Sequence, residues 1–274
     1  MMPHPRSIGG LRHALLGLAV GGALGGAAAA QDAFRDDFES LDRERWYVSD
    51  GWSNGDWQAC TWSERMATVE DGFLRLSLAP TEAGADTYLC AEVQSNGEFG
   101  YGTYEARLRT DKASGVNAAF FTYIGPVHDR THEEIDVEIL TRDTSRFEVN
   151  TYRDGQSAGG EAVPLTTSAD AEFHTFSFTW EPDSIRWYVD GDLVHEATGA
   201  DLPQPPQKVY LSHWNSRSFA DWMGPFEDPG RPLELLVDWV AFTPAGEGCQ
   251  FEGSVLCAPE ASEPASGAGS EAAE

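Results

Sequence analysis

The chain has 274 residues, and its 45 acidic side chains against 18 basic ones give a formal net charge of -27 at pH 7. This charge repels polyanions, so nucleic acids and anionic membranes are excluded as favourable partners, and sulfated or uronic polysaccharides are disfavoured. A neutral polymer is unaffected by it, and we interpret the acidity as an aid to solubility.

The N-terminal segment predicts export. Arg6 and Arg12 precede an apolar run at 14–27, and three alanines before Gln31 offer a small-residue cleavage site. The run is too short for a stable membrane span, although a retained anchor is the alternative. We therefore expect residues 1–30 to be a signal peptide. The mature protein is then secreted, extracellular or periplasmic, with no membrane contact after cleavage.

The remaining chain predicts one β domain at 31–257 followed by a tail at 258–274. Helical periodicity is hard to find, whereas alternation of apolar and polar residues is frequent, and the Asp-Gly pairs at 71–72 and 190–191 signal tight turns. Many short strands without an internal repeat indicate an all-β jelly-roll sandwich of two antiparallel sheets. The tail lacks large apolar residues, so we expect it to be disordered. The clearest expected strands are 73–78, 104–109, 175–180, 185–189, 209–214 and 235–242.

Four cysteines in an exported chain favour disulfides, and three pairings are possible. We favour Cys60 with Cys90, because they lie in segments that we interpret as neighbouring strand ends. Cys249 with Cys257 would then close a short C-terminal loop. Neither pair has the spacing of a zinc site.

The segment at 131–140 reads THEEIDVEIL and carries the candidate chemistry. On a strand, Glu134, Asp136 and Glu138 project from one face, and the apolar residues between them project into the core. Three acids on one face repel one another, so the cluster is costly unless ions, substrate or shared protons compensate. Glu133 lies on the opposite face and is excluded as a nucleophile.

Strand geometry allows the two outer glutamates to work as a pair. Their Cα atoms are about 13 Å apart, and side chains that lean together bring the carboxyl groups to about 5 to 7 Å. This range includes the separation of about 5 to 5.5 Å in retaining glycosidases, where one carboxylate attacks the anomeric carbon and the other group protonates the leaving oxygen. A solvated acidic edge strand and a calcium-binding lectin surface are the alternatives.

Seven segments form a series between Phe34 and Phe242: WYVSDGW at 46–52, CTW at 60–62, FGYGTYE at 99–105, FFTYIGP at 120–126, EIDVE at 134–138, WYVDG at 187–191 and DWMG at 221–224. The series resembles glycoside hydrolase family 16. Within it, the bacterial endo-1,3-1,4-β-glucanases (lichenases) and the succinoglycan-type exopolysaccharide glycanases are most similar. The resemblance implies a concanavalin A-like sandwich with a substrate cleft on its concave face.

The resemblance also implies a retaining endo-β-glucanase that hydrolyses β-1,4 bonds in mixed-linkage 1,3-1,4-β-glucan. Glu134 matches the nucleophile, Asp136 the assisting acid and Glu138 the general acid/base, and no cofactor is needed for catalysis. Cys60 and Cys90 match the family's disulfide. For Tyr123 and Trp222, packing in the protein interior is as good an interpretation as contact with sugar. The full set of implied sugar contacts is Trp52, Asn54, Glu92, Tyr123, Asn150, Tyr152, Trp214 and Trp222.

A structural calcium ion away from the catalytic residues is a further implication, with Asp37, Gly72 and Asp238 at the matching places. Calcium prefers such oxygen ligands, including backbone carbonyls. Lichenases carry a tryptophan and an aspartate where this chain has His132 and Glu133, which bears on substrate preference.

The expected partner is a neutral β-glucan, cleaved by a monomer. The acid strand lacks the extra residue, a β-bulge, that laminarin hydrolases of the family carry between the aspartate and the second glutamate. A succinoglycan-type glycanase is the alternative activity, and a non-catalytic β-glucan-binding lectin is the alternative of another class. A transglycosylase would share every catalytic residue.

Overall fold

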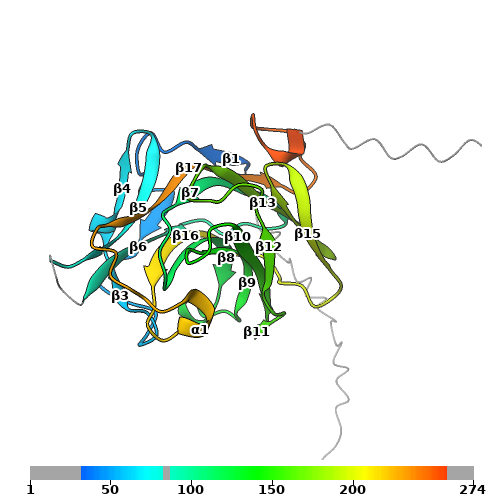
Figure 1. Cartoon of the computed structure of the whole chain (residues 1–274). Helices are drawn as coiled ribbons and strands as arrows, with labels where there is room; N and C mark the ends of the chain where they lie inside the picture. The colour runs from blue at the N-terminus through cyan, green and yellow to red at the C-terminus, as the bar shows by residue number, and fades with distance from the viewer. Residues whose placement is uncertain (1–31, 83–86, 258–274) are drawn as a thin grey trace, which may run out of the picture.

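Strands and tight turns make up the described part of the chain, which is residues 32–82 and 87–257 of a computed structural model (Figure 1). All six segments expected to be strands are strands, and the jelly-roll prediction is confirmed. The expected leader at 1–30 and tail at 258–274 lie outside the described residues and stay predictions. No helix in 32–82 or 87–257 is long and apolar enough to span a membrane.

Two sheets form the sandwich, and we call them sheet A and sheet B. Sheet A contains β1 (Phe34–Asp36), β4 (Ala67–Glu70), β5 (Phe73–Pro80), β7 (Gly102–Thr110), β13 (His174–Trp180), β14 (Ser184–Val189), β15 (Asp192–Thr198) and β17 (Leu233–Pro244). Sheet B contains β2 (Trp46–Val48), β6 (Tyr88–Ser95), β8 (Val116–Ile124), β9 (Glu133–Leu140), β10 (Arg146–Arg153), β11 (Gln156–Ser157), β12 (Glu161–Pro164) and β16 (Lys208–Asn215). The short helices are η1 (Glu64–Met66), η2 (Pro126–His128), α1 (Ala220–Met223) and η3 (Val255–Cys257).

The strand order places β9 inside sheet B. Sheet B runs β2–β6–β16–β8–β9–β10, with β11 and β12 on the outer side of β10. Sheet A runs β15–β14–β13–β7–β17, and β1 and β5 pair with the other side of β17. These pairings are antiparallel, whereas β3 (Cys60–Trp62) runs parallel to β6. The candidate acids therefore lie on a strand that is paired on both sides.

The core between the sheets fixes which face of β9 is turned outward. Ile135, Val137 and Ile139 are at most 1% exposed and pack in the main apolar cluster. Trp187 of sheet A donates its indole N–H to the Asp136 backbone carbonyl at 3.1 Å, so one core side chain bridges the two sheets. A one-residue shift of β9 would bury its acids, so the alternation specifies its register.

Two hairpins follow the expected Asp-Gly signals. Asp71 and Gly72 have φ angles of 56° and 80°, and Asp190 and Gly191 have φ angles of 51° and 91°. Positive φ at both central residues matches the twist of the flanking strands, and glycine accepts it without steric cost.

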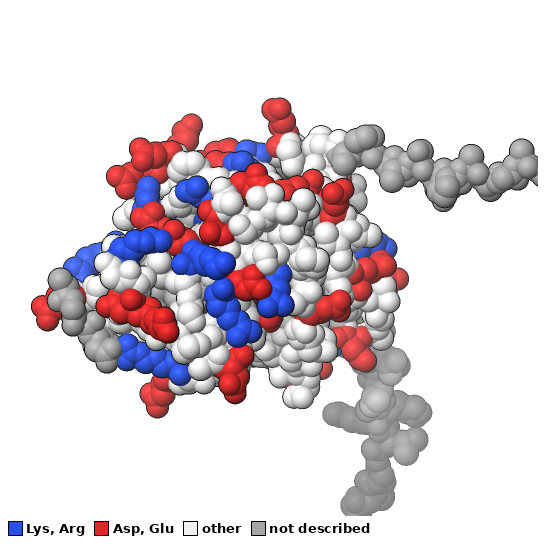
Figure 2. All heavy atoms as spheres, in the orientation of Figure 1, with Lys and Arg blue, Asp and Glu red and all other residues white. Residues whose placement is uncertain are grey.

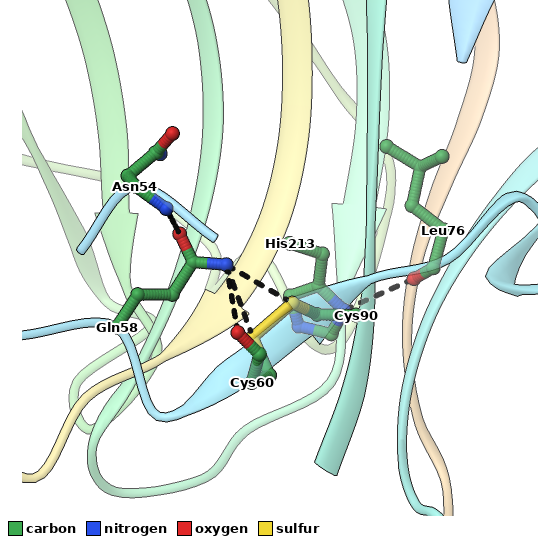
Figure 3. The surroundings of a disulfide bond; sticks show 6 residues. All are labelled: Asn54, Gln58, Cys60, Leu76, Cys90 and His213. Atoms are coloured by element: carbon green, nitrogen blue, oxygen red, sulfur yellow. Dashed lines mark hydrogen bonds between the residues drawn. A yellow bond between two sulfur atoms is a disulfide. The ribbon is translucent and has the colours of Figure 1, made fainter. Parts of the chain in front are cut away.

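Both predicted disulfides are present. Cys60 on β3 bonds to Cys90 on β6, 30 residues later, and Cys249 bonds to Cys257, 8 residues later. In the chain-entropy model, the Cys60–Cys90 bond, which closes the longer loop, stabilises the fold by about 3 to 4 kcal/mol. Figure 3 shows the Cys60–Cys90 bond between the strands and the side chains around it.

Candidate active site

The three acids project from the outer face of β9, as the alternation predicts. Pairing of β9 with both neighbours is continuous from Glu134 to Glu138, so the strand has no bulge there. Glu133 points the other way and is 6% exposed; its carboxylate accepts from the backbone N–H groups of Asp154 and Gln204. Its part is structural, because it ties the start of β9 to two loops.

Each acid lies in a row of residues that crosses the neighbouring strands. Glu134 lies between Tyr123 of β8 and Tyr152 of β10. Paired residues of antiparallel strands share a face, so these rows build one surface around the acids. We call it the acid face. Its other two rows are Phe121–Asp136–Asn150 and Ala119–Glu138–Glu148.

Asp136 is the central acid and is 3% exposed. Its pKa lies well above the usual value, first because burial disfavours the charge and then because Glu134 and Glu138 are negative. A hydrogen bond with Glu134 raises the pKa of Asp136 further. The site therefore favours the protonated form of Asp136, which donates in that bond.

Glu138 also keeps a proton near neutral pH. Burial raises its pKa to about 8, and the charges of Glu134 and Glu148 act in the same direction. The Asn117 side-chain amide, which donates to Glu138 Oε1 at 2.7 Å, lowers that pKa in part. A buried carboxyl of this kind can deliver a proton at neutral pH.

Glu134 is surrounded by hydrogen-bonding and aromatic groups. His132 Nε2 lies 2.5 Å from Glu134 Oε2, and the imidazole stacks on Tyr152 with ring centroids 4.6 Å apart. Tyr123 meets the same imidazole edge-on at 5.2 Å. The acid face thus places the hydrogen-bonded Glu134 on the same strand as Glu138, whose pKa is raised, and a double displacement at an anomeric carbon uses two such acidic side chains.

The structure brings several of the predicted sugar-contact residues to this face. Asn150 and Tyr152 lie on β10 beside the acids, and Tyr123 is half-buried on β8. Glu92 on β6 is 4% exposed, and burial raises its pKa to about 7 although Ser49 donates to it at 2.7 Å. Trp214 is 8% exposed and packs edge-on against Trp57 at 5.0 Å, so most of its ring belongs to a packed cluster.

Trp52 and Asn54 lie in the loop before β3, at one end of sheet B. Trp52 is 38% exposed and meets the core residue Trp62 edge-on at 6.3 Å. Asn54 donates its backbone N–H to the Gln58 side-chain oxygen at 3.1 Å (Figure 3). The amide of Gln58 in turn donates to the Cys60 carbonyl at 3.0 Å and lies 3.5 Å from the Cys90 sulfur (Figure 3). One side chain thus connects this loop to the disulfide.

Trp222 reaches the acid face from α1. It is half-buried, and its indole N–H donates to Glu148 Oε2 at 2.8 Å. Glu148 is the register partner of Glu138. The contact therefore joins a predicted sugar-binding aromatic to the row of the proton-bearing acid.

The sequence analysis did not predict the direct contacts of His132 and Asn117 with the acids. His132 lies two positions before Glu134, so the same-face spacing that selected the acids could have selected it. Asn117 contacts Glu138 from β8, 21 residues away in the chain. No local pattern marks Asn117, because its position opposite the acids depends on strand pairing.

The residues predicted to hold calcium are engaged in other contacts. Asp37 pairs with Arg35 at 2.7 Å, Asp238 pairs with Arg107, and Gly72 lies in the β4–β5 turn. The described ranges contain no group of three or more His, Cys, Asp or Glu side chains placed to hold a metal ion. Arg107 holds the Asp238 carboxylate in this structure, so calcium binding at these residues is not confirmed and stays a prediction.

Paired carboxyl groups with opposite protonation states are the reacting groups of glycoside hydrolases, and the comparisons with known proteins agree with that class. The family model described as "Glycosyl hydrolases family 16" matches residues 54–241. The chain belongs to this family, which confirms the resemblance.

Several relatives are similar over most of their length. The endo-1,3-1,4-beta-glycanase ExoK of Rhizobium meliloti (strain 1021) is 43% identical over 226 residues, which cover 82% of this chain and 84% of that protein. A beta-glucanase of Bacillus subtilis (strain 168) is 36% identical and covers 81% of this chain and 91% of its own. The solved structure of Bacillus licheniformis beta-glucanase is 34% identical with a TM-score of 0.75, over 78% of this chain and 98% of that one.

Proposed function

We propose that this protein is a retaining endo-β-glucanase that hydrolyses β-1,4 bonds in mixed-linkage 1,3-1,4-β-glucan. Glu134 is the nucleophile, Asp136 assists it and Glu138 is the general acid/base. The observation that carries the proposal is the contrast on one strand face between Glu138, whose buried carboxyl has its pKa raised to about 8, and the hydrogen-bonded carboxylate of Glu134. The alternative of a carbohydrate-binding lectin does not require that contrast.

The reaction follows from these positions in two displacements. The Glu134 carboxylate attacks the anomeric carbon while Glu138 gives its proton to the departing glycosidic oxygen, which leaves a glycosyl ester on Glu134. Glu138, now a carboxylate, takes a proton from water as the water attacks the same carbon and releases Glu134. Asp136 donates its hydrogen bond to Glu134 throughout. Every group that these steps use is a side chain of β9.

The proposed substrate rests on three features. The first is the unbulged acid strand. The second is the similarity to an endo-1,3-1,4-beta-glycanase and to several beta-glucanases. The third is charge: Figure 2 shows acidic side chains over much of the face in view, with a group of basic ones near its middle, and the net charge of -27 favours a neutral chain over an anionic one. A succinoglycan-type glycanase is the second candidate, favoured by the WYVSDGW segment.

A panel of polysaccharides tests the proposal. We expect release of reducing ends from lichenan and barley β-glucan and little from laminarin or carboxymethylcellulose, because a kinked mixed-linkage chain fits a surface on which aromatic rings and polar groups set ring orientation. NMR of the first products should show the β anomer, since two displacements restore configuration.

Four outcomes would contradict this assignment. An initial α anomer would exclude a double displacement. Laminarin hydrolysed fastest would overturn the mixed-linkage substrate, and lichenan left intact while succinoglycan is cut would favour the second candidate. Binding of lichenan without any release of reducing ends would favour the lectin.

A structural calcium ion stays a separate proposal, and it requires Asp238 to exchange its Arg107 partner for the metal. If that exchange occurs, calcium chloride added after chelation should raise the melting temperature without changing turnover, because a ligand of the native state stabilises it by mass action. Unchanged melting curves would reject the ion. Loss of turnover on chelation while the protein stays folded would contradict a purely structural role.

A further inference from the structure

His132 contacts Glu134, and the proposed mechanism assigns no role to His132. Its Nε2 lies 2.5 Å from Glu134 Oε2, and the two side chains are 28% and 18% exposed, so water screens the contact only partly. A carboxylate can only accept hydrogen bonds, so Nε2 is the donor when Glu134 is ionised. A donor of this kind to a charged acceptor gives a short and strong hydrogen bond.

The surroundings fix the imidazole on several sides. Its ring stacks on Tyr152, with centroids 4.6 Å apart and planes 15° apart, and Tyr123 meets it edge-on with centroids 5.2 Å apart. These two tyrosines are also the register partners of Glu134 on β10 and β8. The backbone carbonyl of His132 accepts from the Gly155 N–H at 2.9 Å, which ties the residue to the β10–β11 turn.

We propose that His132 is a positioning residue for the nucleophile, an inference that rests on the proposed function. Its imidazole holds Oε2 and thereby sets the plane in which the Glu134 carboxylate meets the anomeric carbon. Asp136 donates to the same carboxylate from the neighbouring row, so Glu134 is held from two directions. A nucleophile held in one orientation reaches the transition state with less reorganisation than one that rotates freely.

Variants that separate the hydrogen bond from the ring test the proposal. His132→Phe keeps an aromatic ring against Tyr152 but has no donor, and His132→Leu lacks both. Each should lower kcat on the preferred glucan by roughly 10- to 100-fold with KM little changed, because the lost bond acts on the attack and not on substrate binding. His132→Gln keeps an N–H donor and should recover most of the loss.

His195→Phe is the matched control. His195 also faces a carboxylate, at 3.7 Å from Glu161, but it lies on β15 at the edge of sheet A. Its replacement should leave kcat unchanged. Melting temperatures of all variants are measured together, so that a loss of folding is separated from a loss of rate.

Three results would overturn the inference: a kcat for His132→Phe and His132→Leu close to that of the unmodified protein, a His132→Gln variant no faster than either, or an effect confined to KM. Glu134→Ala is measured in the same series. If Glu134→Ala keeps full activity, the proposed function fails. If it is inactive while the His132 variants are normal, only the positioning inference fails.

Discussion

Glu134→Ala is expected to lose glucan turnover by at least ~10³-fold, because no other group on the acid face can attack the anomeric carbon in its place. Glu138→Ala should lose ~10²- to 10⁴-fold, the usual contribution of a general acid. Both side chains project away from the core, so melting temperatures should stay near that of the unmodified protein. Initial rates on lichenan and thermal melting curves measure the two effects.

Azide distinguishes the two roles, because a small anion can enter the space left by either carboxyl group. In Glu134→Ala, azide attacks the anomeric carbon directly, and a single displacement gives an α-glycosyl azide. In Glu138→Ala with an activated aryl β-glycoside, the ester on Glu134 still forms, and azide then replaces water to give the β-glycosyl azide. NMR of the products identifies each anomer.

Glu161→Gln serves as the control for these variants, since Glu161 is an exposed acid on β12. It should retain full activity and show no response to azide. Azide products with the two anomers interchanged would mean that the roles of Glu134 and Glu138 are the reverse of those proposed. Full activity in either alanine variant would reject the mechanism.

The second large effect is on pH dependence. The first displacement requires a protonated Glu138, and burial raises the pKa of that carboxyl to about 8. The value of kcat/KM should therefore stay constant up to about pH 8. Above that pH it should fall about tenfold for each further unit, as the protonated fraction of Glu138 falls. The alkaline limb of kcat/KM against pH measures the pKa in the free enzyme.

Two neighbours of Glu138 should move that limb in opposite directions. The charge of Glu148 raises the pKa of Glu138, so Glu148→Gln should shift the fall to lower pH; the glutamine oxygen can still accept from Trp222. The Asn117 hydrogen bond lowers the pKa of Glu138, so Asn117→Ala should shift the fall to higher pH. Shifts in the same direction, or an alkaline limb that neither variant moves, would mean that another group controls it.

Local patterns predicted the parts of this site that depend on a single strand. The alternation along 131–140 was sufficient to place three acids outward and Ile135, Val137 and Ile139 in the core, because the side-chain period of a strand is two. The Asp-Gly turns were predictable from backbone conformation, whereas the Cys60–Cys90 pairing was predicted from the expected strand ends and from the family resemblance.

Contacts between distant segments could not be predicted in the same way. Asn117 meets Glu138 only through the register of β8 on β9, and Trp222 meets Glu148 only through the path of the loop that carries α1. The family resemblance predicts that Trp214 stacks on a sugar ring, yet its packing against Trp57 buries most of the indole. Such outcomes depend on tertiary packing, which local sequence does not encode residue by residue.

The link through Gln58 gives the Cys60–Cys90 bond a consequence beyond thermodynamic stability. Gln58 touches both cysteines and supports the backbone at Asn54, so the covalent bond braces the loop that carries Trp52 (Figure 3). Protein made in a reducing cytoplasm would lack the disulfide. We expect it to fold with a more mobile loop at Trp52 and to bind long polysaccharide chains less tightly. The redox state of the compartment in which the chain folds would then set the order of the loop that carries Trp52.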